Sequence, residues 1–173
     1  MDNKIKFRPI ISIIIILIFL ALDQLSKIWA ANDLSNTPLG VSIIDGVVSL
    51  YYIENTGISF SLLNSHTILI IIVTLIILAL LCFVLIRTPK TRYYLPFSVT
   101  LSVIIAGALG NLIDRILRGY VIDFISLDII NFPVFNVADI CVCLGLFILI
   151  IMIFVKYKDK DFEFIFKKGS KIE

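Results

Sequence analysis

Residues 67–86 of this 173-residue chain read TILIIIVTLIILALLCFVLI, a stretch without a single charged side chain. At about 1.5 Å of rise per residue, a helix of this length spans about 30 Å, the thickness of the hydrocarbon core of a bilayer. Three further apolar runs of similar length occupy about residues 10–30, 95–117 and 137–155. The pattern predicts an α-helical membrane protein with four transmembrane helices, and we expect a single membrane-embedded domain over residues 1–173.

The composition excludes the other broad classes of protein. Hydrophobic residues make up 60% of the chain and charged residues 16%, whereas roughly a quarter of a soluble domain is charged. A soluble domain of this size keeps much of its surface in water and cannot hide such an excess of apolar side chains. Disorder requires the opposite composition. A net charge of +2, without a basic patch interleaved with aromatic residues, argues against a nucleic-acid partner.

Lysine and arginine are unevenly distributed among the segments outside the predicted spans. They occur three times before the first span, three times between the second and third, and six times after the fourth, whereas residues 32–66 carry none and residues 118–136 carry one. By the positive-inside rule, both termini are predicted to be cytoplasmic and the two longer connections extracytoplasmic. Within the first connection, over about residues 41–60, β-branched and aromatic residues on both sides of Asp45-Gly46 predict a small extracytoplasmic β-hairpin.

The ionisable side chains within the spans lie in the predicted outer half of the bilayer. Asp23 is about 20 Å from the start of the first span and is followed by Lys27, while Asn111 is about 24 Å from the start of the third and is followed by Asp114 and Arg115. Each intramembrane charge costs about 2.5–3.5 kcal/mol, so their clustering predicts a polar pocket that opens outward. The i,i+4 pair of Asp23 and Lys27 could contact a substrate or simply neutralise itself, and we expect a structural role for Asp114 and a pocket-facing Arg115.

Two aspartates near the predicted outer interface, Asp123 and Asp139, have no cation beside them in the sequence. The intervening residues 128–133 include Pro133 and could turn the chain to bring the two together. Two carboxylates within a few ångströms cannot both ionise easily, so one keeps a proton near neutral pH. Such a pair supplies a general base for water and a general acid for a leaving amide nitrogen, which is aspartic peptidase chemistry and needs no metal or other cofactor. A lone histidine without clustered partners likewise predicts no metal site.

Five stretches of the chain resemble, in order, the motifs of the lipoprotein signal peptidases, the signal peptidase II family. They are LDQLSK at 22–27, NTGISF at 55–60, GALGNLIDR at 107–115, VIDFI at 121–125 and FNVAD at 135–139. The resemblance extends over nearly the whole chain. It implies an aspartic endopeptidase that removes the signal peptide from diacylglyceryl-modified prolipoproteins, cutting on the N-terminal side of the lipidated cysteine.

The resemblance also implies roles for individual residues. The catalytic pair falls on Asp123 and Asp139. The implied substrate-binding residues are Asp23, Lys27, Asn55, Gly57, Asn111, Arg115, Asn136 and Ala138. The implied partners are the lipid-modified prolipoprotein, membrane lipids and inhibitors of the globomycin type, and the implied location is the bacterial cytoplasmic (inner) membrane with the active site facing the extracytoplasmic side. Because the site draws on three helices of one chain, we expect a monomer.

Two other functions remain open at this point. Intramembrane aspartates also mark ion pathways, so a small ion- or proton-coupled transporter is one alternative. A transporter needs polar groups through the full membrane depth, whereas the inner halves of these spans are apolar. A non-catalytic adaptor that binds a partner helix is the other alternative, and it would tolerate asparagine at both Asp123 and Asp139.

Overall fold

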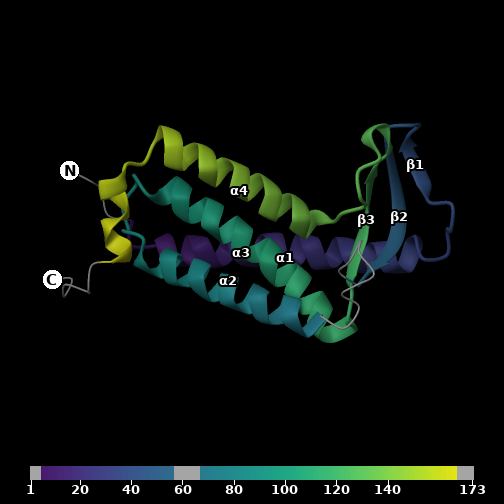
Figure 1. Ribbon diagram of the computed structural model, residues 1–173, viewed down its shortest axis with the longest axis horizontal. Coiled ribbons are helices and arrows are strands. Elements are labelled where there is room, and N and C mark those ends of the chain that lie inside the picture. Colours follow the sequence, from purple (N-terminus) through teal and green to yellow (C-terminus); the bar gives the residue numbers. More distant parts are fainter. Residues whose placement is uncertain (1–4, 57–66, 167–173) are drawn as a thin grey trace.

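The computed structural model describes residues 5–56 and 67–166, and it confirms the four predicted helices. They are α1 (Arg8–Asp33), α2 (Thr67–Arg87), α3 (Leu95–Arg118) and α4 (Val137–Val155), each long and apolar enough to cross a membrane. All four run along the length of the molecule, and a small β-sheet lies at one end of the bundle (Figure 1). The start of α1 and the end of α4 both lie at the opposite end.

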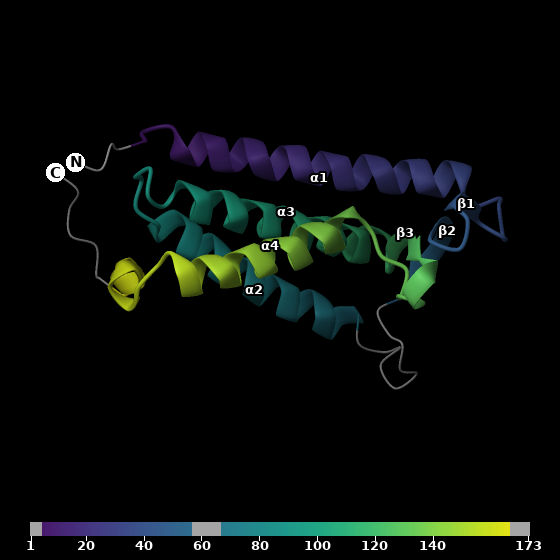
Figure 2. The ribbon, with the colours of Figure 1, turned by 90° about the horizontal axis from the view of Figure 1, so that it is seen from above.

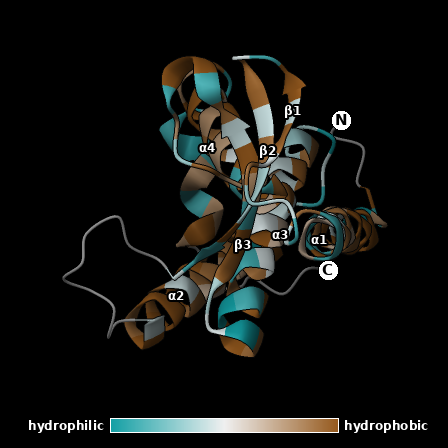
Figure 3. Cartoon of the chain, turned by 90° about the vertical axis from the view of Figure 1, so that its right-hand side faces the viewer, coloured by the Kyte–Doolittle hydropathy of each residue, from teal (hydrophilic) through white to brown (hydrophobic). Residues whose placement is uncertain are grey.

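Helix α3 is the centre of the bundle. It packs against α1, α2 and α4, and α1 and α2 lie on opposite sides of it (Figure 2). Most of α3 is buried, whereas α1, α2 and α4 expose most of their large apolar side chains. Figure 3 shows hydrophobic colours along α1 and α2. An apolar exterior around a hydrogen-bonded helical backbone is what a lipid environment requires.

Two glycines allow α3 and α4 to approach closely. A Cβ atom at Gly107 of α3 would lie 2.5 Å from the backbone oxygen of Ala138 and 3.0 Å from the Cβ of Cys141. A Cβ at Gly145 of α4 would lie 2.5 Å from the Cγ1 of Ile104, the side chain of a residue on α3. Small residues at such crossings let membrane helices gain van der Waals contact without a hydrophobic driving force.

The sheet contains the predicted hairpin and one strand that the sequence did not predict. Strands β1 (Val41–Ile44) and β2 (Val48–Asn55) are antiparallel and form the hairpin, with Val47 included in the turn. Strand β3 (Val121–Leu127) pairs antiparallel with β2, giving the order β1-β2-β3. The first four residues of β3 are all buried, so the strand lacks the apolar–polar alternation that marks a half-exposed strand.

A short connection carries the chain from β3 to the start of α4. It contains a 3-10 turn (Asp128–Ile130) and Asn131 with a positive φ of 49°. After this turn Phe135 forms an antiparallel bridge with Ile125 of β3. The predicted reversal over 128–133 is therefore present, and it places the first turn of α4 beside the middle of β3.

The opposite end of the bundle is closed by a second 3-10 segment (Asp159–Ile165). Its Phe162 and Phe164 join an aromatic cluster with Tyr94, Phe97 and Tyr157. The rings of Tyr94 and Tyr157 stack with centroids 5.6 Å apart, and this cluster fixes the chain after α4 against the start of α3.

The two glycine contacts between α3 and α4 predict unequal effects of an added methyl group. Gly107→Ala meets backbone and should destabilise the protein by about 1–3 kcal/mol through overpacking. Gly145→Ala meets the Cγ1 of the buried, β-branched Ile104, so it should also destabilise the protein, but by less than Gly107→Ala because only a side chain and no backbone has to shift. Thermal unfolding of the two variants in the same detergent measures the difference, and equal shifts would contradict the assignment of Gly107 as the close backbone contact.

Candidate active site

A buried ion-pair network connects α1 to α3. The Nζ of Lys27 lies 2.8 Å from Oδ2 of Asp23, 2.8 Å from Oδ2 of Asp114 and 2.9 Å from Oδ1 of Asn111. Lys27, Asp23 and Asp114 have no exposed surface. Asp114 also pairs with Arg118 one turn along α3. Buried charges are tolerated when they are paired and hydrogen-bonded, and here two carboxylates share two cations.

Asn111 links this network to Asp139. Its Oδ1 accepts hydrogen bonds from Lys27 and from the Nδ2 of Asn136, at 2.9 and 3.1 Å. Its Nδ2 donates to Oδ1 of Asp139 at 2.8 Å. Since Lys27 can only donate, the carbonyl oxygen of Asn111 must face Lys27, and its amino group is therefore directed to the carboxylate.

The first turn of α4 makes hydrogen bonds to both candidate catalytic aspartates. Asn136 is its N-cap: Oδ1 accepts from the backbone N–H of Asp139 at 3.0 Å, and Oδ2 of Asp139 accepts from the backbone N–H of Asn136 at 3.1 Å. This reciprocal pair is a capping box. The Nδ2 of Asn136 also donates to Oδ1 of Asp123 at 2.6 Å, so Asp123 and Asp139 both hydrogen-bond to the same residue.

Asp123 lies on β3 and is 2% exposed. Its second oxygen, Oδ2, accepts from the Nδ2 of Asn55 on β2 at 2.7 Å. Burial raises the pKa of the Asp123 carboxyl above its usual range, and the nearby charge of Asp139 adds to the rise. The hydrogen bonds from Asn55 and Asn136 oppose this shift because they stabilise the ionised form, but burial prevails.

Two cavities border these residues. One, of about 280 Å³, is lined by Ile53, Glu54, Asn55, Thr56, Asp123, Pro133 and Val134. The other, of about 380 Å³, lies between α2, α3 and α4 and is lined by Thr74, Ile77, Leu81, Ile104, Ala108, Asn111, Arg115, Val142 and Leu146. The second cavity is apolar apart from Thr74 and its polar head at Asn111 and Arg115. It therefore suits an extended apolar segment that ends in a polar group.

The structure places the predicted site residues in three ways. One set forms a continuous series of hydrogen bonds and ion pairs: Asp23, Lys27, Asp114, Asn111, Asn136, Asp139, Asp123 and Asn55. Arg115 lines the larger cavity, and its Nη1 donates to the backbone oxygen of Asn111 at 3.3 Å. Ala138 donates its backbone N–H to Oδ1 of Asp23 at 2.9 Å. Gly57 lies outside the described residues.

The full burial of Asp23 and Lys27 bears on the two roles left open for them. Neither side chain has surface available to a substrate. Lys27 contacts Asn111, which donates to Asp139, and Asp23 accepts from the backbone of Ala138 in the first turn of α4. Their geometry favours neutralisation and positioning over direct contact. Asp114, fully buried between Lys27 and Arg118, likewise has the surroundings expected of a structural residue.

Sequence reasoning missed Arg118, which pairs with Asp114, and it missed a second member of the network, Gln24. Its Nε2 donates to Oδ2 of Asp23 at 3.1 Å and to the backbone oxygen of Gly110 at 3.3 Å. A neutral amide within an apolar span also requires partners, and this signal was present between Asp23 and Lys27. Within the described part of the chain, no group of three or more His, Cys, Asp or Glu side chains is arranged to hold a metal ion.

The sequence of this chain is similar to those of known proteins of one kind. A family model described as signal peptidase (SPase) II matches residues 15–155. The lipoprotein signal peptidase of Streptococcus agalactiae serotype Ia is 41% identical over 132 residues, covering 76% of this chain and 84% of the relative. That of Caldicellulosiruptor bescii is 40% identical over 126 residues, covering 73% and 79%.

Two solved structures, both described as bacterial membrane enzymes determined by the in meso method, have the same fold. One has a TM-score of 0.74 and 29% identity, and the match covers 100% of this chain and 99% of the chain in that structure. The other has a TM-score of 0.77 and 31% identity, and it covers 91% and 99%.

The network predicts a large stability loss on removal of its central cation. Lys27→Met leaves Asp23 and Asp114 buried with too few cations and should cost about 3–5 kcal/mol. Thermal unfolding in detergent measures this loss. The exposed Lys160→Met is the matched control and should leave the unfolding temperature unchanged. Adding Asp23→Asn to Lys27→Met should restore part of the stability, and a Lys27→Met protein as stable as the wild type would contradict the network.

Proposed function

The chain belongs to the signal peptidase II family, and from this membership we propose that Asp123 and Asp139 form its catalytic pair. The family makes the chain a multi-pass bacterial membrane peptidase that removes signal peptides from prolipoproteins. We further propose an aspartic mechanism, a substrate that carries diacylglyceryl on its cysteine, and cleavage on the N-terminal side of that cysteine. The membership supports a peptidase over the transporter and adaptor alternatives.

One observation carries the assignment of the pair. Asp123 comes from a strand and Asp139 from a helix, yet both carboxylates hydrogen-bond to Asn136. Fold stability alone does not require two acidic groups to converge on one asparagine, with one of them on the lining of a cavity. Their convergence beside Asn111 and Arg115 favours a reaction centre over two independent anchors.

The surroundings of the two carboxylates support separate roles. Burial raises the pKa of Asp123, which favours it as the holder of the shared proton. In this mechanism Asp139 takes a proton from water, and the water attacks the peptide carbonyl carbon. Asp123 hydrogen-bonds the carbonyl oxygen, and its proton then passes to the leaving nitrogen. The pair titrates as a unit, so the apparent pKa values of the reaction belong to both residues together.

The larger cavity supports a mode of substrate binding. Its apolar walls between α2, α3 and α4 suit the hydrophobic part of a signal peptide, and Arg115 at its head can hold backbone carbonyls through its several N–H donors. An inhibitor of the globomycin type would compete for the same space. In this proposal the sheet end of the bundle is extracytoplasmic, as the distribution of lysine and arginine predicts, and the lipid chains of the substrate remain in the outer leaflet.

Substitution of either aspartate is the direct test. Asp123→Asn and Asp139→Asn should each reduce cleavage of a diacylglyceryl-modified prolipoprotein in liposomes by at least about 10²–10⁴-fold, because each removes one acid–base group. The exposed Asp159→Asn, at the other end of the bundle, should retain activity. A chelator should have no effect on the wild type.

Two results would overturn parts of this proposal. Near-normal activity of either folded asparagine variant would exclude the pair while leaving family membership intact. A folded wild type that cleaves no lipidated substrate would exclude the peptidase activity itself. Thermal unfolding of every variant separates loss of activity from loss of fold.

Asn55 predicts a change in pH dependence. Its N–H stabilises the ionised form of Asp123 and so lowers the pKa of that carboxyl. In Asn55→Ala the pKa should rise further, and the singly protonated pair should persist to higher pH. The alkaline limb of the profile of kcat/KM against pH should therefore move to higher pH. Thr56→Ala, in the same cavity, is the control without this shift, and an unmoved limb in Asn55→Ala would show that Asn55 does not tune Asp123.

A further inference from the structure

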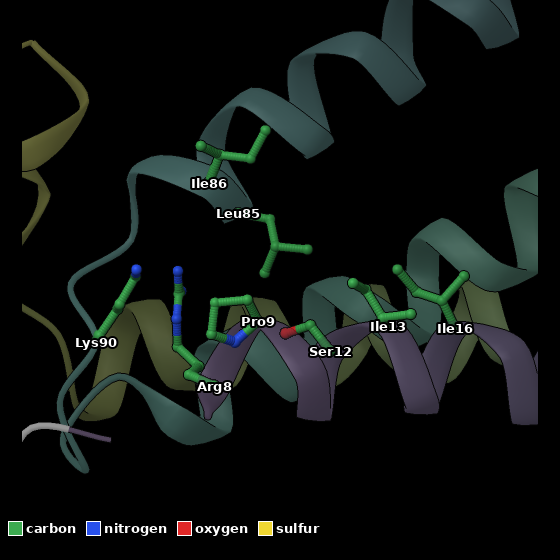
Figure 4. Close-up of a pocket in the computed structure, with 8 residues that line it drawn as sticks. All are labelled: Arg8, Pro9, Ser12, Ile13, Ile16, Leu85, Ile86 and Lys90. Carbon is green, nitrogen blue, oxygen red and sulfur yellow. The ribbon is translucent and has the colours of Figure 1, made fainter. Parts of the chain in front are cut away.

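A cavity of about 260 Å³ lies at the end of the bundle opposite the sheet. It is lined by Arg8, Pro9, Ser12, Ile13, Ile16, Leu85, Ile86 and Lys90 (Figure 4). None of these residues belongs to the proposed catalytic site. The residues come from the first turns of α1, the last turn of α2 and the connection between α2 and α3.

Arg8 is a buried cation with incomplete pairing. Its side chain is 3% exposed, and its Nη1 donates to the Oγ of Ser98 at 2.9 Å. Its Nε is buried and has no hydrogen-bond partner among the described residues. No acidic residue lines the cavity, and no ion pair joins Arg8 to a carboxylate in the described part of the chain. Burying a cation without an anion is costly, so the arrangement calls for a negative ligand.

Lys90 adds a second positive charge to the same cavity. Its side chain lies near Arg8 in the view of Figure 4, with both nitrogen ends directed the same way. The backbone oxygen of Lys90 accepts a hydrogen bond from the N–H of Ile5 at 2.7 Å. This bond fixes the α2–α3 connection against the segment that precedes α1, so the two cations come from segments that are already joined.

Apart from Ser12, the remaining walls are apolar, and they reach the lipid-facing surface. Ile13 and Ile86 line the cavity and are 56% and 77% exposed on the outside of the bundle. A ligand here can therefore place an anionic group on Arg8 and Lys90 while its hydrocarbon follows the isoleucines. A free phosphate would leave the apolar walls unused, and the basic end of a signal peptide would be repelled by both cations.

We propose that this cavity binds the phosphate of an anionic phospholipid from the leaflet at this end of the bundle, with Arg8 and Lys90 as the phosphate ligands. Basic pockets between membrane helices are suited to anionic headgroups, and guanidinium groups bind phosphate oxygens with directed hydrogen bonds. The site is independent of the catalytic pair, so it stands whether or not Asp123 and Asp139 are catalytic.

Native mass spectrometry of the full chain in mild detergent tests the proposal. Phosphatidylglycerol should remain bound to the wild type at least about fivefold more than phosphatidylcholine of the same chain length. Arg8→Gln and Lys90→Gln should each abolish most of this preference. Lys160→Gln, which removes an exposed lysine outside the cavity, should keep it. Lys90 is exposed, so its variant remains informative if Arg8→Gln does not fold.

Competition distinguishes a lipid from a free anion. Glycerol phosphate or inorganic phosphate at millimolar concentration should not displace phosphatidylglycerol, because neither contacts the apolar walls. Displacement by these solutes would overturn the lipid assignment in favour of a small anion. Equal retention of phosphatidylcholine, or an unchanged preference in both Arg8→Gln and Lys90→Gln, would overturn the site.

Discussion

The pairing of Lys27 with two carboxylates and an amide is the interaction on which the rest of the molecule depends. A helical bundle in lipid gains no hydrophobic energy from bringing its helices together, so packing and polar contacts must hold it. Lys27 ties α1 to α3 through Asp114 and Asn111, and its partner Asp23 ties α1 to α4 through the backbone of Ala138. One buried ammonium group thus fixes the relative depth of three helices, and through Asn111 it also orients the amide of Asn136.

The features that the sequence predicted are those that depend on local composition. Each span is a continuous apolar run, and its length alone predicts a crossing helix, so all four helices were predicted within three residues of their ends. The hairpin followed from a turn signal between β-branched residues. The reversal over 128–133 followed from a stretch that includes Pro133, and the structure places it where predicted.

The features that the sequence did not predict depend on partners far apart in the chain. Strand β3 has an apolar sequence without alternation because it is buried on both faces. Its partner strand β2 lies earlier in the chain, with α2 and α3 between them. Gln24 and the bridging role of Asn136 depend on which amide faces which carboxylate. Depth along a span indicates that polar groups share a level of the bilayer, but it carries no information about rotation around each helix axis.

The bond between Asp23 and the backbone of Ala138 has a consequence for biosynthesis. Its two partners are 115 residues apart, so the first span enters the bilayer long before the fourth has been synthesised. Until then Asp23 and Lys27, one turn apart, can neutralise each other within a single helix. The amide groups that hold Asp123 and Asp139 come from β2, α3 and the N-cap of α4, so no incompletely inserted chain contains the assembled site. Under the proposed catalytic assignment, only the finished bundle therefore has the geometry to cleave a neighbouring chain, and assembly itself keeps the hydrolase inactive until synthesis is complete.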